Sequence, residues 1–370
     1  MRHWIGAIVA IPLCAAALAG QDRSAGLSGG REIYHAACAS CHGADGRGAP
    51  DNVRGFEAPD TFPDFTDCQA TARESDDFWG AILHNGGPAR GFSEIMPSFR
   101  EALSAHQIDE AMLHLRTFCR EPAWPRGEMN LPRPLVTEKA FPEDEMVLDL
   151  AFGAEGDPAI TSEIVYEKRL GPRGQLDFIL PFHFEKREGE PWRNGVGDMV
   201  AGYKHVLASD LDRGALLAAA GEVKLATGDS DRGRGTGVTV FEGFASYAQL
   251  LPRSAFLQLQ AGVELPTDTE FANRAVFWRV VGGKTFAQGL GMGRQWSPMV
   301  ELLADRELAS GERVHWDVVP QFQVTLSRRQ HIRANLGLRV PLNDFGPRTT
   351  EVLFYLMWDM FDGGVFDGWK

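Results

Sequence analysis

The clearest pattern in the chain is an alternation of apolar and polar residues that begins near residue 145 and continues almost to the end. In the stretch HIRANLGLRVPL, every second residue from Ile332 to Leu342 is apolar, and Arg333, Asn335 and Arg339 lie between them. The stretches FLQLQAGVEL and QLDFILPFHFE alternate in the same way. A period of two puts successive side chains on opposite faces of a strand, so this region is predicted to be all-β.

About twelve such runs follow one another, beginning near residues 145, 158, 173, 194, 212, 236, 253, 272, 294, 312, 329 and 346. Most have about 11 to 16 residues, which exceeds the five or six usual in globular proteins and suffices to cross a bilayer at a tilt. The turn sequences GPRG, LPRS and SRRQ, and the longer GDSDRGRGTG, separate the runs. We therefore expect antiparallel strands joined by hairpins.

Two architectures fit long amphipathic antiparallel strands. A soluble sandwich or barrel is apolar inside, whereas an outer-membrane barrel is apolar outside and polar inside. Strand length and an even strand count favour an antiparallel transmembrane β-barrel over residues 145–370, in contact with outer-membrane lipid. Aromatic residues near strand ends suit the interfacial girdles of such a barrel, namely Trp278, Trp296, Trp316, Trp358, Tyr203, Tyr247 and Tyr355.

The N-terminal third has a different pattern. Residues 28–120 are predicted to be a small all-α domain, whose last helix is marked by a capping box formed by Ser104 and Gln107. Apolar residues at helical spacing follow the box as far as Phe118. Residues 121–144 contain five prolines, which exclude a continuous helix or a central strand, so an extended proline-rich linker is expected there.

The first 19 residues have the parts of a secretory signal peptide: basic Arg2 and His3, an apolar run to Leu18, and a small-residue cleavage site ending at Ala19. No later segment is an apolar helix of about 20 residues, so a helical membrane protein is not expected. The net charge of −13 argues against a nucleic-acid partner, which requires a basic face. The chain is thus predicted to be exported by a Gram-negative cell.

The candidate chemistry lies in the stretch HAACASCHG, which contains the motif C-x-x-C-H at Cys38, Cys41 and His42. In an exported chain this motif predicts covalent attachment of haem c, with the two thiols bonded to the vinyl groups and His42 as the proximal iron ligand. A zinc half-site would need a second pair of ligands, and a thioredoxin-like disulfide would need a preceding strand. The motif occurs once, so one haem is predicted.

The second axial ligand is predicted to be Met96, in the stretch GFSEIMPSF, about 55 residues after His42. The competing residues are His84, His106 and Met112. Met112 falls on the apolar face of a predicted helix, and His84 falls at a helix end, where a solvated histidine is common. A thioether ligand occupies the remaining coordination position of the iron, which suits electron transfer and leaves no position for a substrate. No enzymatic activity is therefore expected.

Two further cysteines, Cys68 and Cys119, remain in the exported chain. In an oxidising compartment such a pair is expected to form a disulfide. Two free buried thiols are the alternative.

With its C-x-x-C-H motif and its downstream Met-Pro, the segment 28–120 resembles a class I c-type cytochrome. The resemblance implies that the last helix packs across the first near Gly30 and Tyr34. It also implies that the carbonyl group of Pro50 orients the ring of His42.

The stretch GDMVAGYKHVL, from Gly197 to Leu207, resembles a family of proteobacterial outer-membrane barrels of transporter type. The whole arrangement is similar to predicted fusions of a cytochrome with such a barrel. A domain of about 90 residues has a diameter of roughly 30 Å and does not fit inside a twelve-stranded barrel, so the haem domain is expected in the periplasm. Two functions follow. One is electron transfer with a periplasmic redox partner, and the other is a channel or transporter for a small solute with the cytochrome as sensor or lid.

Overall fold

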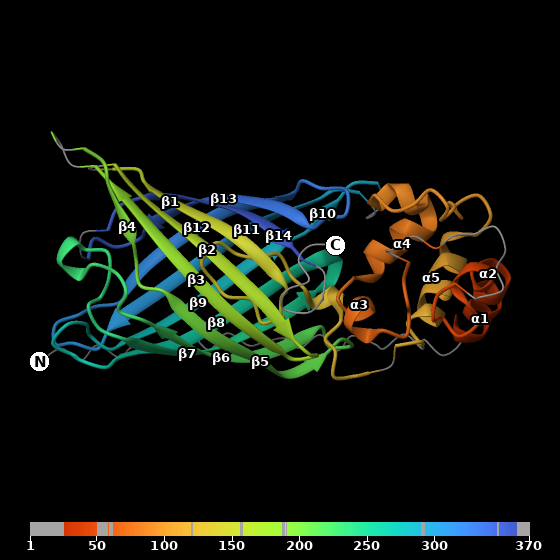
Figure 1. Ribbon diagram of the computed structural model, residues 1–370, viewed down its shortest axis with the longest axis horizontal. Coiled ribbons are helices and arrows are strands. Elements are labelled where there is room, and N and C mark those ends of the chain that lie inside the picture. The colour runs from red at the N-terminus through yellow and green to blue at the C-terminus, as the bar shows by residue number, and fades with distance from the viewer. Residues whose placement is uncertain are drawn as a thin grey trace, which may run out of the picture.

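A computed structural model shows a β-barrel and a group of helices that lie end to end, with the helices beyond one mouth of the barrel (Figure 1). We call this end the helical mouth and the opposite end the far mouth. The expected signal peptide and Pro50 lie outside the described residues. The structure describes residues 26–49, 58, 62–119, 121–155, 158–186, 189, 191–289, 293–345 and 348–360.

The N-terminal third is helical, as predicted. Side chains satisfy the first backbone N–H groups of three helices: Asp67 caps α3, Ser75 caps α4, and Ser104 with Gln107 forms the expected capping box at the start of α5. The helices are α1 (Gly26–Ala37), α2 (Ala39–His42), α3 (Cys68–Ala72), α4 (Asp76–Asn85) and α5 (Ala105–Leu115), with short 3-10 turns η1 (Gly87–Arg90) and η2 (Gly127–Met129).

Helices α1 and α5 cross in close contact at Gly30. A Cβ atom on Gly30 would lie 2.0 Å from the backbone carbonyl oxygen of Glu110, so only glycine allows the two backbones to approach this closely. Tyr34, one turn further along α1, is fully buried, and its ring centre lies 5.1 Å from that of Phe118. This crossing is the one implied by the resemblance to class I cytochromes.

Gly30→Ala is therefore expected to destabilise the helical domain by about 3 kcal/mol, because the added methyl group forces the helices apart. Thermal unfolding of the purified protein, followed by haem absorbance, measures the effect. Gly80→Ala is the matched control, because a Cβ atom on Gly80 in α4 meets nothing within 4 Å. That control should gain about 0.5–1 kcal/mol from higher helix propensity. Equal stability of the two variants would contradict the close crossing.

The rest of the chain forms a closed antiparallel barrel, as the period-two pattern predicted. Of the 14 strands in the described part of the chain, the short β4 (Arg193–Val196) and β10 (Phe286–Ala287) extend their neighbours, and the other twelve close through the pairs β1–β14 and β9–β11. The twelve are β1 (Glu145–Gly153), β2 (Ala159–Leu170), β3 (Gly174–Glu185), β5 (Val200–Asp210), β6 (Ala215–Lys224), β7 (Val240–Leu251), β8 (Ala255–Pro266), β9 (Ala275–Lys284), β11 (Gln295–Glu307), β12 (His315–Thr325), β13 (Ile332–Pro341) and β14 (Glu351–Asp359).

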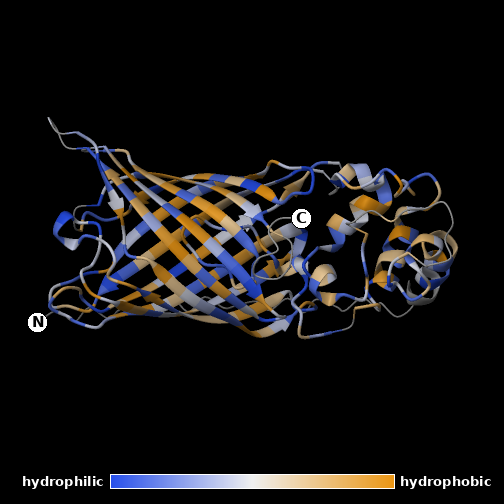
Figure 2. Cartoon of the chain, in the orientation of Figure 1, coloured by the Kyte–Doolittle hydropathy of each residue, from blue (hydrophilic) through white to orange (hydrophobic). Residues whose placement is uncertain are grey.

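The two faces of the barrel wall have opposite polarity. Along β13, Leu336 is 55% exposed on the outside, whereas the adjacent Asn335 is 1% exposed on the inside. Glu301 and Gln258 are likewise buried on the inward face. Figure 2 shows apolar bands that alternate with polar ones along the strands. An apolar exterior around a polar interior is the arrangement of a membrane barrel, the opposite of a soluble one.

One residue of the expected aromatic girdle is placed differently. Tyr355 is fully buried and faces the interior, because its neighbours Phe354 and Leu356 occupy the outward positions of β14. Its hydroxyl group donates to the backbone carbonyl of Arg133 at 2.8 Å. The prediction that Tyr355 belongs to the girdle was wrong, since proximity to a strand end does not say which face a side chain takes.

The connections at the two mouths differ in length. The turns GPRG, LPRS and SRRQ lie at the helical mouth, and GDSDRGRGTG belongs to a long loop at the far mouth. Asp198 organises that loop by accepting hydrogen bonds from the backbone N–H groups of Gly228 at 2.9 Å and Thr236 at 2.6 Å. The longer connection from β9 to β11 also lies at the helical mouth and contains β10.

Candidate haem site and barrel lumen

The C-x-x-C-H motif forms one helical turn at the junction of α1 and α2. The backbone N–H groups of Cys41 and His42 donate to the carbonyl of Cys38 at 3.1 and 2.9 Å. The Tyr34 hydroxyl donates to the carbonyl of Gly43 at 2.7 Å and holds the end of this turn against the α1–α5 crossing. Both thiols are free, and that of Cys38 is buried. The turn thus presents two thiols and an imidazole together, as covalent haem attachment requires.

His42 is prepared to bind a metal. The residue is 9% exposed, and its ring stacks on that of Phe62 with centroids 4.7 Å apart. Burial lowers the pKa of His42 to about 4, so the imidazole is neutral at physiological pH, which is the form that ligates iron. Among the described residues, its buried Nδ1 atom has no hydrogen-bond partner. The carbonyl of Pro50, expected to fill that role, lies outside the described part of the chain.

Aromatic side chains surround the motif. Phe65 lies 4.9 Å from His42 and 5.2 Å from Trp79, measured between ring centres. Within the described ranges, the buried indole Nε1 of Trp79 also has no acceptor. Two free thiols, a neutral buried imidazole and the buried indole N–H group of Trp79 fit a haem c group, whose polar edge would supply an acceptor for that N–H group.

Met96 lies half-buried on the loop between η1 and α5. The backbone carbonyl of Met96 accepts from the N–H group of Gly87 at 3.0 Å, and its own N–H group donates to Ser93 at 3.3 Å. The role of Met96 as iron ligand stays a prediction, and it is strengthened by where its competitors lie.

The three competing ligands are engaged elsewhere. Met112 is 4% exposed and packs with Leu83 and Ile108 in the helical core. The ring of His84 lies 2.8 Å from the side chain of Asn85, and His106 lies 3.5 Å from Glu110 with a side chain that is 82% exposed.

Cys68 and Cys119 form a disulfide, with Cα atoms 5.2 Å apart, between the start of α3 and the segment after α5. Beside it, the carboxylate of Asp76 accepts from Arg116 and Arg126, each at 2.8 Å. Burial opposes ionisation of Asp76, but the two guanidinium groups hold its pKa below the usual value. Because Arg126 belongs to the proline-rich segment, this cluster fixes the beginning of that segment to the helical domain.

The proline-rich segment is more than a linker, because residues 129–143 enter the barrel. We call these residues the lumenal segment. The guanidinium group of Arg133 donates to Glu145 and to Glu167, both at 2.8 Å, and all three side chains are buried. The backbone N–H group of Arg133 donates to the side-chain oxygen of Gln323 at 3.1 Å. A charged residue of the segment is thereby paired with two buried carboxylates inside the barrel.

A single inward carboxylate binds the middle of the lumenal segment. Glu301 on β11 accepts from the backbone N–H groups of Leu135 at 2.9 Å, Val136 at 3.1 Å and Thr137 at 2.9 Å. The Thr137 hydroxyl adds a bond at 2.6 Å. Inward-facing amide side chains bind the same segment, and Gln258 donates to the backbone carbonyl of Pro132. A segment without regular structure can be buried here because the barrel wall supplies its backbone partners.

Near the helical mouth the lumenal segment is held by apolar contacts. Its residues Met129, Leu131, Ala140 and Phe141 pack in one buried cluster. The barrel contributes inward-facing Val206, Leu216, Ala218, Ala248, Phe256, Val281 and Met299 to the same cluster. At this level the wall is therefore apolar along β5 to β9 and β11, whereas β1, β3 and β14 carry Glu145, Gln175 and Asp359 at the same mouth.

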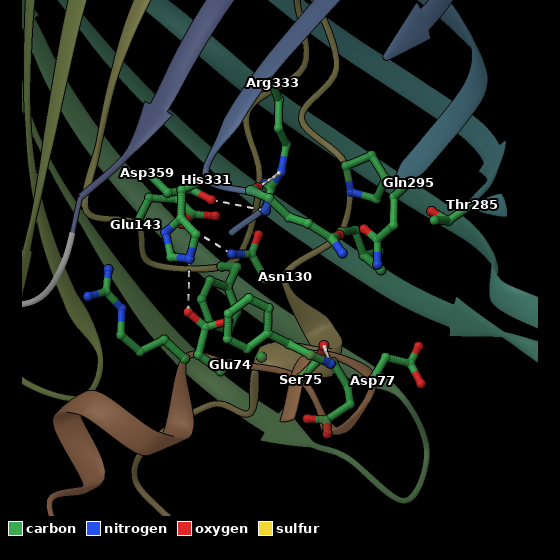
Figure 3. A pocket seen from close by; sticks show the side chains of 18 of the residues that line it. Glu74, Ser75, Asp77, Asn130, Glu143, Thr285, Gln295, His331, Arg333 and Asp359 are labelled. Carbon is green, nitrogen blue, oxygen red and sulfur yellow. Dashed lines mark hydrogen bonds and ion pairs between the residues drawn. The ribbon is translucent and has the colours of Figure 1, made fainter. Parts of the chain in front are cut away.

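A cavity of about 220 Å³ lies where the helices meet the barrel. The imidazole Nε2 of His331 lies 3.4 Å from a carboxylate oxygen of Glu74, and Arg333 pairs with Asp359 at 2.9 Å (Figure 3). Arg73 of the helical domain donates to the carbonyl of Met360. The two parts of the chain thus contact each other directly, in addition to being joined by the lumenal segment.

Comparison with solved structures found matches of low similarity. An outer membrane channel from Pseudomonas putida F1 is 12% identical, with a TM-score of 0.45, over 58% of this chain and 94% of that chain. The NanC porin is 7% identical, with a TM-score of 0.40, over 59% of this chain and 100% of its own. Likeness at this level carries no argument about function. Comparison with curated proteins gave no match.

The helical part has a family assignment. Residues 25–115 match the family described as Cytochrome C oxidase, cbb3-type, subunit III. None of the described helices is long and apolar enough to cross a membrane. The geometry of Cys38, Cys41 and His42 agrees with the family match, and both imply haem c binding. Residues 25–115 are therefore a c-type cytochrome domain, joined in this chain to a closed twelve-stranded antiparallel β-barrel.

Proposed function

We propose that this protein is an electron-transfer protein anchored in the outer membrane by its barrel, with the haem domain in the periplasm. The observation that carries the proposal is the lumenal segment. It is continuous with the cytochrome domain and bonded to the barrel wall through Glu301, Glu145 and Glu167. Such a segment supports a barrel that serves as a mount for the haem rather than as an open pore.

A bound haem c supplies a one-electron change at iron. The chain's own residues prepare for that chemistry: Cys38 and Cys41 attach the group, His42 offers a neutral imidazole, and Met96 offers a thioether. Soft Met and His ligation raises the reduction potential and leaves no position for a substrate. We therefore propose a carrier of electrons for a periplasmic redox partner and no catalytic activity.

The placement in the outer membrane rests on the barrel surface. Apolar side chains such as Phe178, Phe241 and Leu336 are 49 to 55% exposed on the outer wall, where water would make them costly. Outer-membrane barrels have short periplasmic turns and longer outer loops. Since the short turns lie at the helical mouth, the cytochrome domain is assigned to the periplasm.

The membrane assignment predicts two properties of one gel band. Because a closed barrel resists unheated detergent, the band should migrate differently before and after boiling, and haem stain should follow it in both positions. Fractionation of cells should place this band in the outer membrane. Haem stain of full-length protein in the soluble periplasm would rule out the anchor.

A second candidate function is a channel or transporter for a small solute, with the cytochrome domain as sensor or lid. The observation in its favour is a row of inward-facing carboxylates on neighbouring strands. Glu222 lies opposite Glu242, and Glu242 lies opposite Glu264. Such a row would attract cations if the lumen opened. Conductance measurements separate the two functions.

A further inference from the structure

The loop that carries Met96 contacts a turn of the barrel. We call residues 86–99, between α4 and α5, the distal loop. Arg329, in the turn between β12 and β13, donates from Nη2 to the carbonyl of Gly91 at 3.1 Å. Its guanidinium carbon also lies 4.5 Å from the centre of the Phe92 ring. One side chain of the barrel thus binds the distal loop through both its backbone and an aromatic face.

The distal loop is closed by its own backbone, which links this contact to Met96. The Phe92 N–H group donates to the carbonyl of Gly87 at 2.9 Å, and the Gly87 N–H group donates to the carbonyl of Met96 at 3.0 Å. A Cβ atom on Gly87 would lie 2.2 Å from the Ser93 carbonyl oxygen, so the two sides of the loop touch. A shift at Gly91 or Phe92 is therefore passed to Met96 through two hydrogen bonds.

A second contact beside it holds helix α4 against the same barrel turn. Phe78 is 8% exposed, and its ring meets Phe92 edge-on at 6.3 Å and His331 edge-on at 5.9 Å. His331 in turn lies 3.4 Å from Glu74, just before α4 (Figure 3). The barrel turn therefore touches both the helix that precedes the distal loop and the loop itself.

We propose that Arg329 positions Met96, so that the barrel stabilises the distal ligand of the haem. This inference rests on the proposed function, in which Met96 ligates iron. Arg329 is a positioning residue, because it contacts the loop and not the iron. A bond from a thioether to ferric iron is weak, so its population depends on how strongly the loop is held in place. The barrel would then influence the ligation of the haem iron as well as the position of the haem domain.

The test measures how readily added imidazole displaces Met96 from ferric haem in the full-length protein in detergent. Arg329→Ala should bind imidazole about tenfold more tightly than wild type, because one charge-assisted hydrogen bond and a cation–π contact are lost. Arg329→Lys should restore part of the difference. Arg328→Ala is the matched control, since Arg328 is exposed in the same turn, and it should behave as wild type.

Three outcomes are separable. Equal imidazole affinity in Arg329→Ala and Arg328→Ala would overturn the positioning role. A low-spin spectrum that persists in Met96→Ala would instead reject Met96 as ligand, whatever Arg329 does. If Arg329→Ala lost the heat-modifiable gel band, the barrel would have failed to fold, and Phe92→Leu would serve as the test instead. That substitution removes the ring that Arg329 contacts and changes no residue of the barrel. Phe92→Leu should also tighten imidazole binding, and wild-type affinity there would again overturn the proposal.

Discussion

Replacing residues 131–141 with a Gly/Ser stretch of equal length is expected to turn a barrel that carries no resolvable current into one that conducts. The exchange removes Arg133 and its bonds to Glu145 and Glu167, and it removes the apolar side chains packed at the helical mouth. The inward wall is then left hydrated, and its carboxylates should make the current cation-selective. Planar-bilayer recordings of wild type and variant measure both properties.

A point substitution should give a graded form of the same result. Glu301→Ala removes the acceptor of the Val136 and Thr137 N–H groups, and one of the two acceptors of the Leu135 N–H group. Each buried donor left without a partner costs about 1–3 kcal/mol, so brief openings are expected. Glu264→Ala is the matched control, an inward carboxylate on β8 that should leave the barrel closed. A conducting wild type would favour the channel over the anchor. A closed Gly/Ser variant would contradict the expectation that the lumenal segment is what closes the barrel.

Met96→Ala is expected to convert the haem from low-spin to high-spin. Removing the thioether leaves the iron with His42 alone as a strong protein ligand, and a water molecule or an open position takes the sixth place. Visible absorbance and electron paramagnetic resonance of the purified protein report the change. The reduction potential should fall at the same time, because a Met ligand raises it.

Two substitutions make the result specific. Met96→His should keep the spectrum low-spin while lowering the potential, since imidazole is a strong but harder ligand. Met112→Leu changes another methionine of the domain at nearly constant volume and should change neither property. If Met96→Ala kept the wild-type spectrum, a different sixth ligand would have to be sought among the histidines.

The lumenal segment limits the orientations that the cytochrome domain can take relative to the barrel. A cytochrome on a flexible tether samples many orientations. A cytochrome bonded to the barrel through Arg73, Arg329 and Glu74, and through the segment itself, keeps one orientation. With one C-x-x-C-H motif in the chain, a wire of haems across the membrane is not expected. Under the proposed function, a fixed orientation would suit delivery of electrons to or from one site at the helical mouth.

Much of the fold and of the candidate site could be predicted from local pattern. Strand faces follow a period of two, so the twelve strands and the alternation of their faces could be predicted, although Tyr355 was placed on the wrong face. The C-x-x-C-H motif needs only one helical turn, which Cys38 and His42 form by themselves. The capping box at Ser104 is equally local. Each of these features depends on residues within a few positions of one another.

The contents of the barrel could not be predicted in this way. The five prolines indicate only that residues 121–144 lack regular structure, and a linker is the simplest interpretation of that pattern. One sign was present on the inward face: Gly337 has no side chain, and a Cβ atom there would lie 2.5 Å from Leu135. Glycine in a strand has several explanations, however, so it could not identify the occupant.

The sequence by itself therefore determined the haem motif, the twelve strands and the polarity of the barrel wall. Only the tertiary structure decided that the barrel is filled by its own preceding segment, that Tyr355 faces inward to bind it, and that Arg329 reaches the loop of Met96. The physical reason is the range of the interactions. Leu135 and Glu301 are 166 positions apart in the chain, and Arg329 and Gly91 are 238 apart. No periodicity records such pairs, because each is a contact between hydrogen-bonding groups that only closure of the barrel brings together.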